Sequence, residues 1–429
     1  MLFSSLLVLA VAPFIHAASV PVTNHDHDHT HVERVALPKR WYHAEGHPVH
    51  DLFKRGPGDD GETRPAVGSQ AWLDQFPAQR PDVSQLPAAW TAALDAAVKA
   101  GKIPNIPIPT GTGSTNPVYP AGANPMSPEI CSATYKCRNK EDIWDAPDGV
   151  FASSFDDGPQ PSTAGLVQFL QSNDVKTTHF MIGINIRANP QLFLQAFNAG
   201  HDIAVHTYNH PYMTTLSNQE VLAQLGWTMQ IIHESTGGRL PRYWRPPYGD
   251  SDERVRAIAG EIFGLETVIW NQDTIDWGMS TGITKPEDVA SHLQQWISGP
   301  KSPGLVILEH EISDLSVGAF ITAFPLIAQN GWKFMSLAET FGDSPYLNAD
   351  SSTSATVTKA SILDGGDATS SSSSSSTSAT TTSSSTSTSS TPTPTIKTNA
   401  TKNAGMKVQQ SYYWTASLVL AGVIAGSLL

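Results

Sequence analysis

The sequence predicts a parallel α/β fold over about residues 146–342, and three observations support this prediction. Short apolar runs alternate with longer helix-like segments, the order expected when helices connect parallel strands. Two of the helix-like segments begin with the residues of a capping box. Polar residues of catalytic types follow the ends of several apolar runs. The spacing of the runs leaves open whether the sheet is open or closed into a barrel.

Six apolar runs are the predicted strands. Strands of a parallel sheet are buried on both faces and therefore read as nearly continuous apolar stretches. The runs lie at residues 150–155, 177–182, 202–205, 267–270, 305–308 and 333–336.

The predicted helices are recognised by their first residues. Ser217 and Glu220 are spaced as a capping box, which predicts a helix that runs to about Glu234 and ends before two glycines. Thr284 and Glu287 repeat the spacing and predict a second helix that ends near residues 298–299.

Residues 65–145 precede the predicted sheet and differ from it in composition. They contain one short helix-like stretch, around residues 86–100, followed by a proline-rich connection. We expect this part to wrap or cap the sheet. It also holds the two cysteines of the chain, Cys131 and Cys137, which predict one small disulfide in a secreted protein. Two free thiols are the alternative.

Both ends of the chain are typical of a secreted, membrane-anchored protein. Residues 1–17 are apolar and end in small residues, which predicts a signal peptide. Residues 343–402 are a predicted stalk, because Ser or Thr fills 24 of the 27 positions from 369 to 395. Residues 403–429 predict a glycolipid (GPI) anchor signal with attachment at Asn403, and Asn399 begins an N-glycosylation sequon. A short tail anchor is the alternative.

Residues 18–64 are polar and carry seven histidines. We expect a disordered arm or pro-segment here, with a metal site as the alternative. The formal net charge of −13 argues against nucleic acid as a partner. We expect the protein to be a monomer.

Two adjacent carboxylates, Asp156 and Asp157, follow the first predicted strand, and Gly158 and Pro159 come directly after them. Inside a strand, two neighbouring side chains point to opposite faces, whereas in a turn both can face one pocket. Two anions this close are costly unless a cation joins them. We therefore interpret one Asp as a metal ligand and the other as a free base. A plain surface turn is the alternative.

A second motif, His206 to His210, follows the strand that ends at Val205. Histidines four residues apart lie on one side of a helical turn and can bind one ion. Two imidazoles with one carboxylate leave positions open for water and substrate, the pattern of a catalytic zinc site. A purely structural histidine pair is the alternative.

Three further motifs follow later in the chain. Residues 243–249 form a rigid, aromatic loop. In this loop, Arg245 can bind a carboxylate, and a backbone N–H can donate a hydrogen bond to an oxyanion. A histidine, His310, follows a strand and suits a general acid if an aspartate orients it. Asp273 and Asp276 follow the strand before it.

In this order, the motifs resemble those of the polysaccharide deacetylase (NodB-homology) family, and most of all fungal chitin deacetylases with a glycolipid anchor. The one departure is Ser154, where the family usually has threonine, and the hydroxyl is kept. The resemblance implies a distorted (β/α) barrel with an incomplete set of strands. The five motifs lie at residues 154–159, 206–210, 245–248, 273–277 and 308–310.

The resemblance also implies a role for each site residue. Asp157, His206 and His210 would hold one divalent metal ion, with Zn²⁺ expected and Co²⁺ as the alternative. Asp156 would be the general base and His310 the general acid. The other implied members of the site are Arg245 beside Asp156, the N–H of Tyr248 at the oxyanion, Asp276 or Asp273 beside His310, and Trp277 and Leu308 around the acetyl methyl.

The activity implied is hydrolysis of the N-acetyl groups of chitin, giving chitosan and acetate at a fungal cell surface. Two alternatives remain at this point: deacetylation of peptidoglycan or xylan, and a wall-binding protein without activity.

Overall fold

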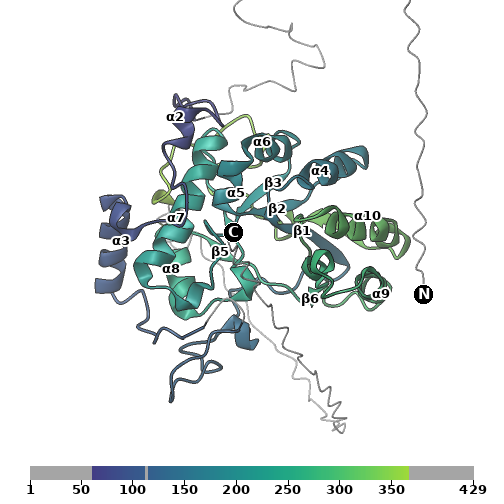
Figure 1. Cartoon of the computed structure of the whole chain (residues 1–429), viewed down its shortest axis with the longest axis horizontal. Coiled ribbons are helices and arrows are strands. Elements are labelled where there is room, and N and C mark those ends of the chain that lie inside the picture. The colour runs from purple at the N-terminus through teal and green to yellow at the C-terminus, as the bar shows by residue number, and fades with distance from the viewer. Residues whose placement is uncertain (1–59, 112–114, 367–429) are drawn as a thin grey trace, which may run out of the picture. The chain divides into compact units, whose positions relative to one another are not determined.

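The computed structural model describes residues 60–111 and 115–366, and helices surround the strands in this part of the chain (Figure 1). Six strands form one sheet in the order β5-β4-β3-β2-β1-β8, while β6 and β7 pair with each other. All of these pairings are parallel. The strands are β1 Val150–Gly158, β2 Thr178–Met181, β3 Asp202–Val205, β4 Tyr243–Trp244, β5 Glu266–Thr267, β6 Gln272–Asp273, β7 Ile307–Leu308 and β8 Lys333–Ser336.

The two sheets meet at β1. Single parallel bridges join Phe151 to Leu305 and Asp156 to His310, so the chain around β7 lies along β1. The sheet thus curves around an interior without a continuous ring of paired strands. This is the distorted (β/α) barrel of the predicted fold class, which is confirmed.

Helices cover the outer side of the strands and fill the connections between them (Figure 1). They are α2 Gln70–Leu73, α3 Ala88–Lys99, α4 Thr163–Ser172, α5 Gly183–Ala188, α6 Pro190–Asn198, α7 Asn218–Ser235, α8 Glu253–Phe263, α9 Pro286–Ile297, α10 Asp314–Gln329 and α11 Leu337–Thr340.

The capping box of α7 is confirmed. The backbone N–H of Ser217 donates to Oε2 of Glu220 at 2.9 Å, and the N–H of Glu220 donates to Oγ of Ser217 at 3.3 Å. The capping box predicted at Thr284 is wrong, because the N-cap of α9 is Lys285, whose side chain makes no cap hydrogen bond. Proline suits the first position of a helix, so Pro286 sets the start one residue beyond the expected place.

Three large apolar clusters hold the barrel together. One packs β2 and β3 against α5 to α8 and also takes in Trp72 and Trp90 from the segment before the barrel. Another packs β1 and β7 against α4, α9 and α10. A third cluster includes Phe180, Trp270 and Leu308.

The segment before the barrel is attached to it at several points. Cys131 and Cys137 form the expected disulfide. The guanidinium of Arg256, on α8, donates to the Cys131 carbonyl at 2.6 Å and to the buried carboxylate of Asp142 at 2.7 Å. The described residues from 60 to 145 therefore wrap the barrel and pack into its core.

Residues 343–366, the first part of the predicted stalk, are folded against the barrel. Residues 343–366 pack on the barrel, because their apolar side chains Tyr346, Val357 and Ile362 are buried. The N–H of Arg242 donates to the Pro345 carbonyl at 3.0 Å at the same place.

The predicted signal peptide, the histidines of the arm, the Ser/Thr run, Asn399 and the anchor signal with Asn403 lie outside the described residues. Within residues 60–111 and 115–366, no helix has the length and apolar character to cross a membrane.

Candidate active site

Both adjacent carboxylates lie inside β1, which continues to Gly158, and a β-bulge sets their directions. Asp156 pairs with Phe180 and Gly158 pairs with Met181, so Asp157 is the extra residue, with φ of 70°. The Nε2 atom of His206 lies 3.8 Å from an Asp156 oxygen and 3.2 Å from Oδ1 of Asp157. We expected a Gly-Pro turn to place both carboxylates on one side, and this expectation is wrong. The β-bulge at Asp157 places them there.

The two histidines of the second motif come together through a loop and not through a helical turn, which corrects the expected geometry. Thr207 and His210 have φ of 62° and 61°, outside the helical region. Nδ1 of His206 lies 2.7 Å from the Arg245 carbonyl, so this ring nitrogen donates and Nε2 is left for the site. Burial lowers the pKa of His210 to about 4, which keeps its ring neutral.

Asp157, His206 and His210 bring one ligand atom each to a common point, with all three atoms within 4.8 Å of one another. Nε2 of His210 lies 3.3 Å from Oδ1 of Asp157. That oxygen is buried and accepts no hydrogen bond from the described residues. Burial would raise the pKa of Asp157, but the nearby rings of His210 and His206 lower it below its usual range. The donor set and the unpaired oxygen fit a divalent cation.

Arg245 fixes the other carboxylate. Its side chain is fully buried, and Nη1 donates to Oδ1 of Asp156 at 2.6 Å. Nη2 donates to the hydroxyl of Ser154 at 3.0 Å, and the guanidinium lies 4.2 Å from the centre of the Phe180 ring. Ser154, the one departure from the family motif, thus contacts Arg245 through the hydroxyl that serine and threonine share. Asp156 is held in one orientation beside the cluster of Asp157, His206 and His210.

His310 forms the second charged pair of the site. Nδ1 of its ring lies 2.6 Å from Oδ1 of Asp276, whose Oδ2 accepts the backbone N–H of His310 at 2.9 Å. Burial alone would lower the pKa of His310, but the charge of Asp276 raises it to about 10. Asp273 instead accepts the N–H of Ile275 at 2.9 Å. Of the two carboxylates expected beside His310, Asp276 therefore makes the contact.

The remaining predicted residues lie on the same loops. Tyr248 has φ of 60° in a short turn and is 48% exposed, and its ring lies 4.7 Å from that of His210. Trp277 follows Asp276 and is 41% exposed. Leu308 is buried at the end of β7, two residues before His310.

A buried polar chain behind β1 escaped the sequence reasoning. Nδ1 of His179 lies 2.7 Å from Oε1 of Glu311, and its Nε2 lies 3.2 Å from Nδ1 of His201. All three side chains are fully buried. Two features of the sequence could have indicated this chain of contacts. Glu311 directly follows His310, and His179 lies inside the predicted strand 177–182. Burial lowers the pKa of His201 to about 3, so this ring is neutral.

The carboxylate of Glu311 leaves no space for a Cβ at residue 158. A Cβ at residue 158 would lie 2.1 Å from Oε1 of Glu311, an atom that His179 holds in place. We expect Gly158→Ala to lower the free energy of unfolding by about 1–3 kcal/mol and to displace the neighbouring Asp157. Thermal unfolding and turnover would measure both effects.

The matched control for this substitution is Gly165→Ala on α4, where an added Cβ meets nothing within 4 Å. Alanine favours a helix over glycine by about 1 kcal/mol, so this variant should be as stable as the unaltered protein or more so. Equal stability of the two variants would contradict the packing described for Gly158.

The chain is similar to several known deacetylases. A family model described as polysaccharide deacetylase matches residues 145–267. Chitin deacetylase 3 of Cryptococcus neoformans var. neoformans is 39% identical over 339 residues, which cover 77% of this chain and 80% of that protein. Chitin deacetylase 1 of Saccharomyces cerevisiae is 35% identical over 53% of this chain and 73% of its own length. The solved chitin deacetylase of Colletotrichum lindemuthianum is 26% identical, covering 48% of this chain and 94% of that one, with a TM-score of 0.44.

Proposed function

This chain belongs to the polysaccharide deacetylase family, and from that premise we propose that Asp157, His206 and His210 hold one divalent metal ion at which N-acetyl groups of chitin are hydrolysed. The observation that carries the proposal is the convergence of three ligand atoms on one point, one of them a buried, unpaired carboxylate oxygen. The relatives that cover most of the chain are named chitin deacetylases, which favours chitin over peptidoglycan or xylan.

The ligand set of two imidazoles and one carboxylate suits Zn²⁺, and Co²⁺ is the alternative. When bound, such an ion supplies a Lewis acid that polarises the acetamide carbonyl. The ring of His206 is oriented for this role by the Arg245 carbonyl at its other nitrogen.

Asp156 is the general base in this proposal. It takes a proton from the attacking water while the water oxygen bonds to the carbonyl carbon. Oδ1 of Asp156 accepts the hydrogen bond from Arg245, and Oδ2 lies 3.8 Å from Nε2 of His206. The base therefore faces the reacting group in a fixed orientation.

His310 is the general acid. Its raised pKa keeps the ring protonated at neutral pH, so it can donate a proton to the sugar nitrogen as the C–N bond breaks. The N–H of Tyr248 donates to the oxygen on which negative charge develops. Trp277 and Leu308 surround the acetyl methyl. The products are acetate and a glucosamine unit.

The composition of the two terminal segments supports a site of action outside the cell. We infer a signal peptide at 1–17, a Ser/Thr stalk that starts after the packed residues ending at 366, and a glycolipid anchor at Asn403. The enzyme would then face the wall polymer from the membrane surface.

Removal and return of the metal test the proposal. We expect chelator-treated protein to release no acetate from chitin oligomers, and reloading with Zn²⁺ or Co²⁺ to restore release with about one ion per chain. His210→Ala should require far more added metal for the same rate.

The same assay separates the alternatives. Faster release from acetylated xylan or peptidoglycan fragments would change the substrate assignment. Reloaded protein that binds chitin and releases no acetate would identify a wall-binding protein without activity.

A further inference from the structure

One buried carboxylate joins the loop that carries a proposed metal ligand to the loop that carries the proposed oxyanion donor. Asp250 lies two residues after Tyr248, at the end of the short turn Pro247–Gly249, and its side chain is fully buried. The N–H and the hydroxyl of Thr214 both donate to its Oδ2 at 2.8 Å. Thr214 lies four residues after His210. The carboxylate therefore ties the loop of His210 to the loop of Tyr248.

The disulfide loop is the third segment at this carboxylate. The hydroxyl of Thr134 donates to Oδ1 of Asp250 at 2.7 Å, and Thr134 lies inside the loop that the disulfide closes. The backbone adds a second link, because the N–H of Ala133 donates to the Ser251 carbonyl at 2.9 Å. The segment before the barrel is thus bonded to the active-site loops by a side-chain and a backbone hydrogen bond.

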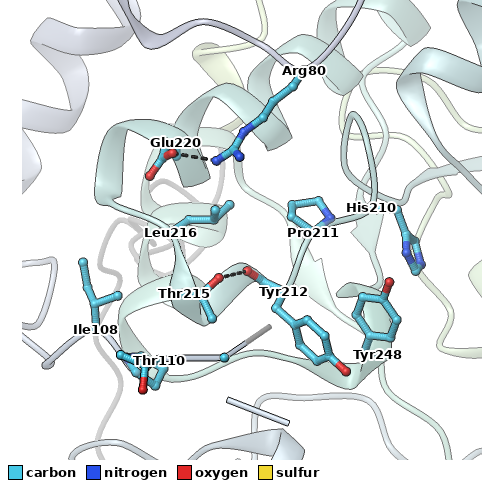
Figure 2. A pocket seen from close by; sticks show the side chains of 12 residues that line it. Arg80, Ile108, Thr110, His210, Pro211, Tyr212, Thr215, Leu216, Glu220 and Tyr248 are labelled. Carbon is cyan, nitrogen blue, oxygen red and sulfur yellow. Dashed lines mark hydrogen bonds and ion pairs between the residues drawn. The ribbon is translucent and has the colours of Figure 1, made fainter. Parts of the chain in front are cut away.

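The two active-site loops have backbone conformations that the surrounding structure must impose. His210 and Tyr248 have φ of 61° and 60°, in a region that residues other than glycine rarely adopt. The ring of Tyr248 stacks on that of Tyr212 with centroids 4.1 Å apart and lies 4.7 Å from the ring of His210. These rings line a pocket that Arg80 and Ile108 complete on its other sides (Figure 2). A buried carboxylate that bonds to both loops can impose such conformations.

We propose that Asp250 is a positioning residue, held by the disulfide loop through Thr134. It fixes the metal ligand His210 relative to the backbone N–H of Tyr248. The hydrogen bonds of Asp250 go to the two threonines and not to the reacting groups. The inference rests on the proposed function, because the two loops gain their roles from the metal ion and the oxyanion.

Asp250→Ala tests the proposal, because it removes the acceptor that both threonines use. We expect Zn²⁺ to bind about tenfold more weakly in competition with a chelator, since residues that orient metal ligands contribute about 10- to 100-fold to affinity. At saturating Zn²⁺, kcat on chitin oligomers should fall about 10- to 100-fold while KM stays nearly the same. This loss is smaller than the roughly 10²- to 10³-fold expected when an oxyanion donor is removed, because the N–H of Tyr248 is displaced and not deleted.

Asp252→Ala is the matched control. Asp252 is also fully buried, and it accepts hydrogen bonds from the Tyr119 hydroxyl and the Val255 N–H, both at 2.9 Å. These partners lie in the segment before the barrel and in α8, outside the two active-site loops. We expect both variants to lower Tm, and only Asp250→Ala to change Zn²⁺ affinity and kcat. Equal losses in the two variants would make Asp250 a general support of the fold and overturn the proposal.

A second pair of variants tests the link to the disulfide loop if Asp250→Ala does not fold. Thr134→Val keeps the shape of the side chain and removes the hydroxyl donor, whereas Thr134→Ser keeps the donor. We expect kcat to fall about threefold to tenfold for the Val variant, the net contribution of one hydrogen bond, and the Ser variant to stay within about twofold. Equal kcat and equal Zn²⁺ affinity in these two variants would overturn the proposal.

The Zn²⁺ affinity separates this inference from the proposed function, because its measurement needs no turnover. If the unaltered protein releases no acetate from any chitin oligomer but Asp250→Ala still weakens Zn²⁺ binding, the proposed function fails and the positioning of His210 remains. If acetate is released and neither Zn²⁺ affinity nor kcat responds to Asp250→Ala, the proposed function stands and the positioning role is overturned.

Discussion

Replacement of Asp156 by Asn should lower kcat about 10²- to 10⁴-fold while the protein still folds and binds metal. The amide oxygen of Asn can still accept the hydrogen bond that Arg245 now donates to Asp156. The amide has no basic oxygen of comparable strength, so the proton of the attacking water is left without an acceptor. Acetate release from chitin oligomers measures the loss of turnover, and metal content per chain measures whether metal binding is kept.

Asp157→Asn is the matched control, because it changes the neighbouring carboxylate in the same way. We expect this variant to lose metal affinity, since Asp157 Oδ1 is one of the three converging ligand atoms. Metal content therefore distinguishes the two aspartates even where both variants are slow. Turnover of Asp156→Asn at the rate of the unaltered protein would disprove the role of Asp156 as the base.

Replacement of Asp276 by Asn should move the alkaline limb of the pH–rate profile to lower pH. In the unaltered protein, Asp276 raises the pKa of His310 to about 10, so the acid keeps its proton until the pH approaches that value. Without this charge, burial lowers the pKa of His310, and the ring loses its proton at lower pH. We expect kcat at pH 8 to fall about 10²-fold, as for the loss of a general acid.

Asp273→Asn provides the comparison. Asp273 lies three residues before Asp276, at the end of β6, and its oxygen accepts the N–H of Ile275, a bond that an Asn oxygen can also accept. This variant should keep its alkaline limb close to that of the unaltered protein. Equal shifts in the two variants would mean that His310 responds to the general charge of the loop and not to its contact with Asp276.

The strands of four or more residues could be predicted, and β7 lies inside the predicted run 305–308, but the other two-residue strands were predicted in part or not at all. Residues 202–205 and 333–336 are the strands β3 and β8 as predicted. The two-residue strands β4 and β6 were not expected, and the run 267–270 contributes only Thr267 to β5. Two paired residues leave no periodic pattern in a sequence, and their pairing depends on neighbours that are distant along the chain.

The local geometry of the site was predicted less well than its composition. A bulge turns Asp157, and a loop with positive φ joins His206 to His210. Residues other than glycine adopt such φ values only where the surrounding structure imposes them. A pattern of residue types contains no information about that imposed geometry.

The sequence by itself predicted the candidate site residues, and it was sufficient for the fold class and for the disulfide between Cys131 and Cys137. These follow from residue types in a fixed order and from the short distance between the cysteines along the chain. Only the tertiary structure decided that Asp276, and not Asp273, contacts His310. It also decided that Arg245 joins Asp156 to Ser154. Finally, it placed residues near 80 and 108 beside His210, where they complete a pocket. Each of these contacts joins positions far apart in sequence, and packing of the whole chain sets their distances.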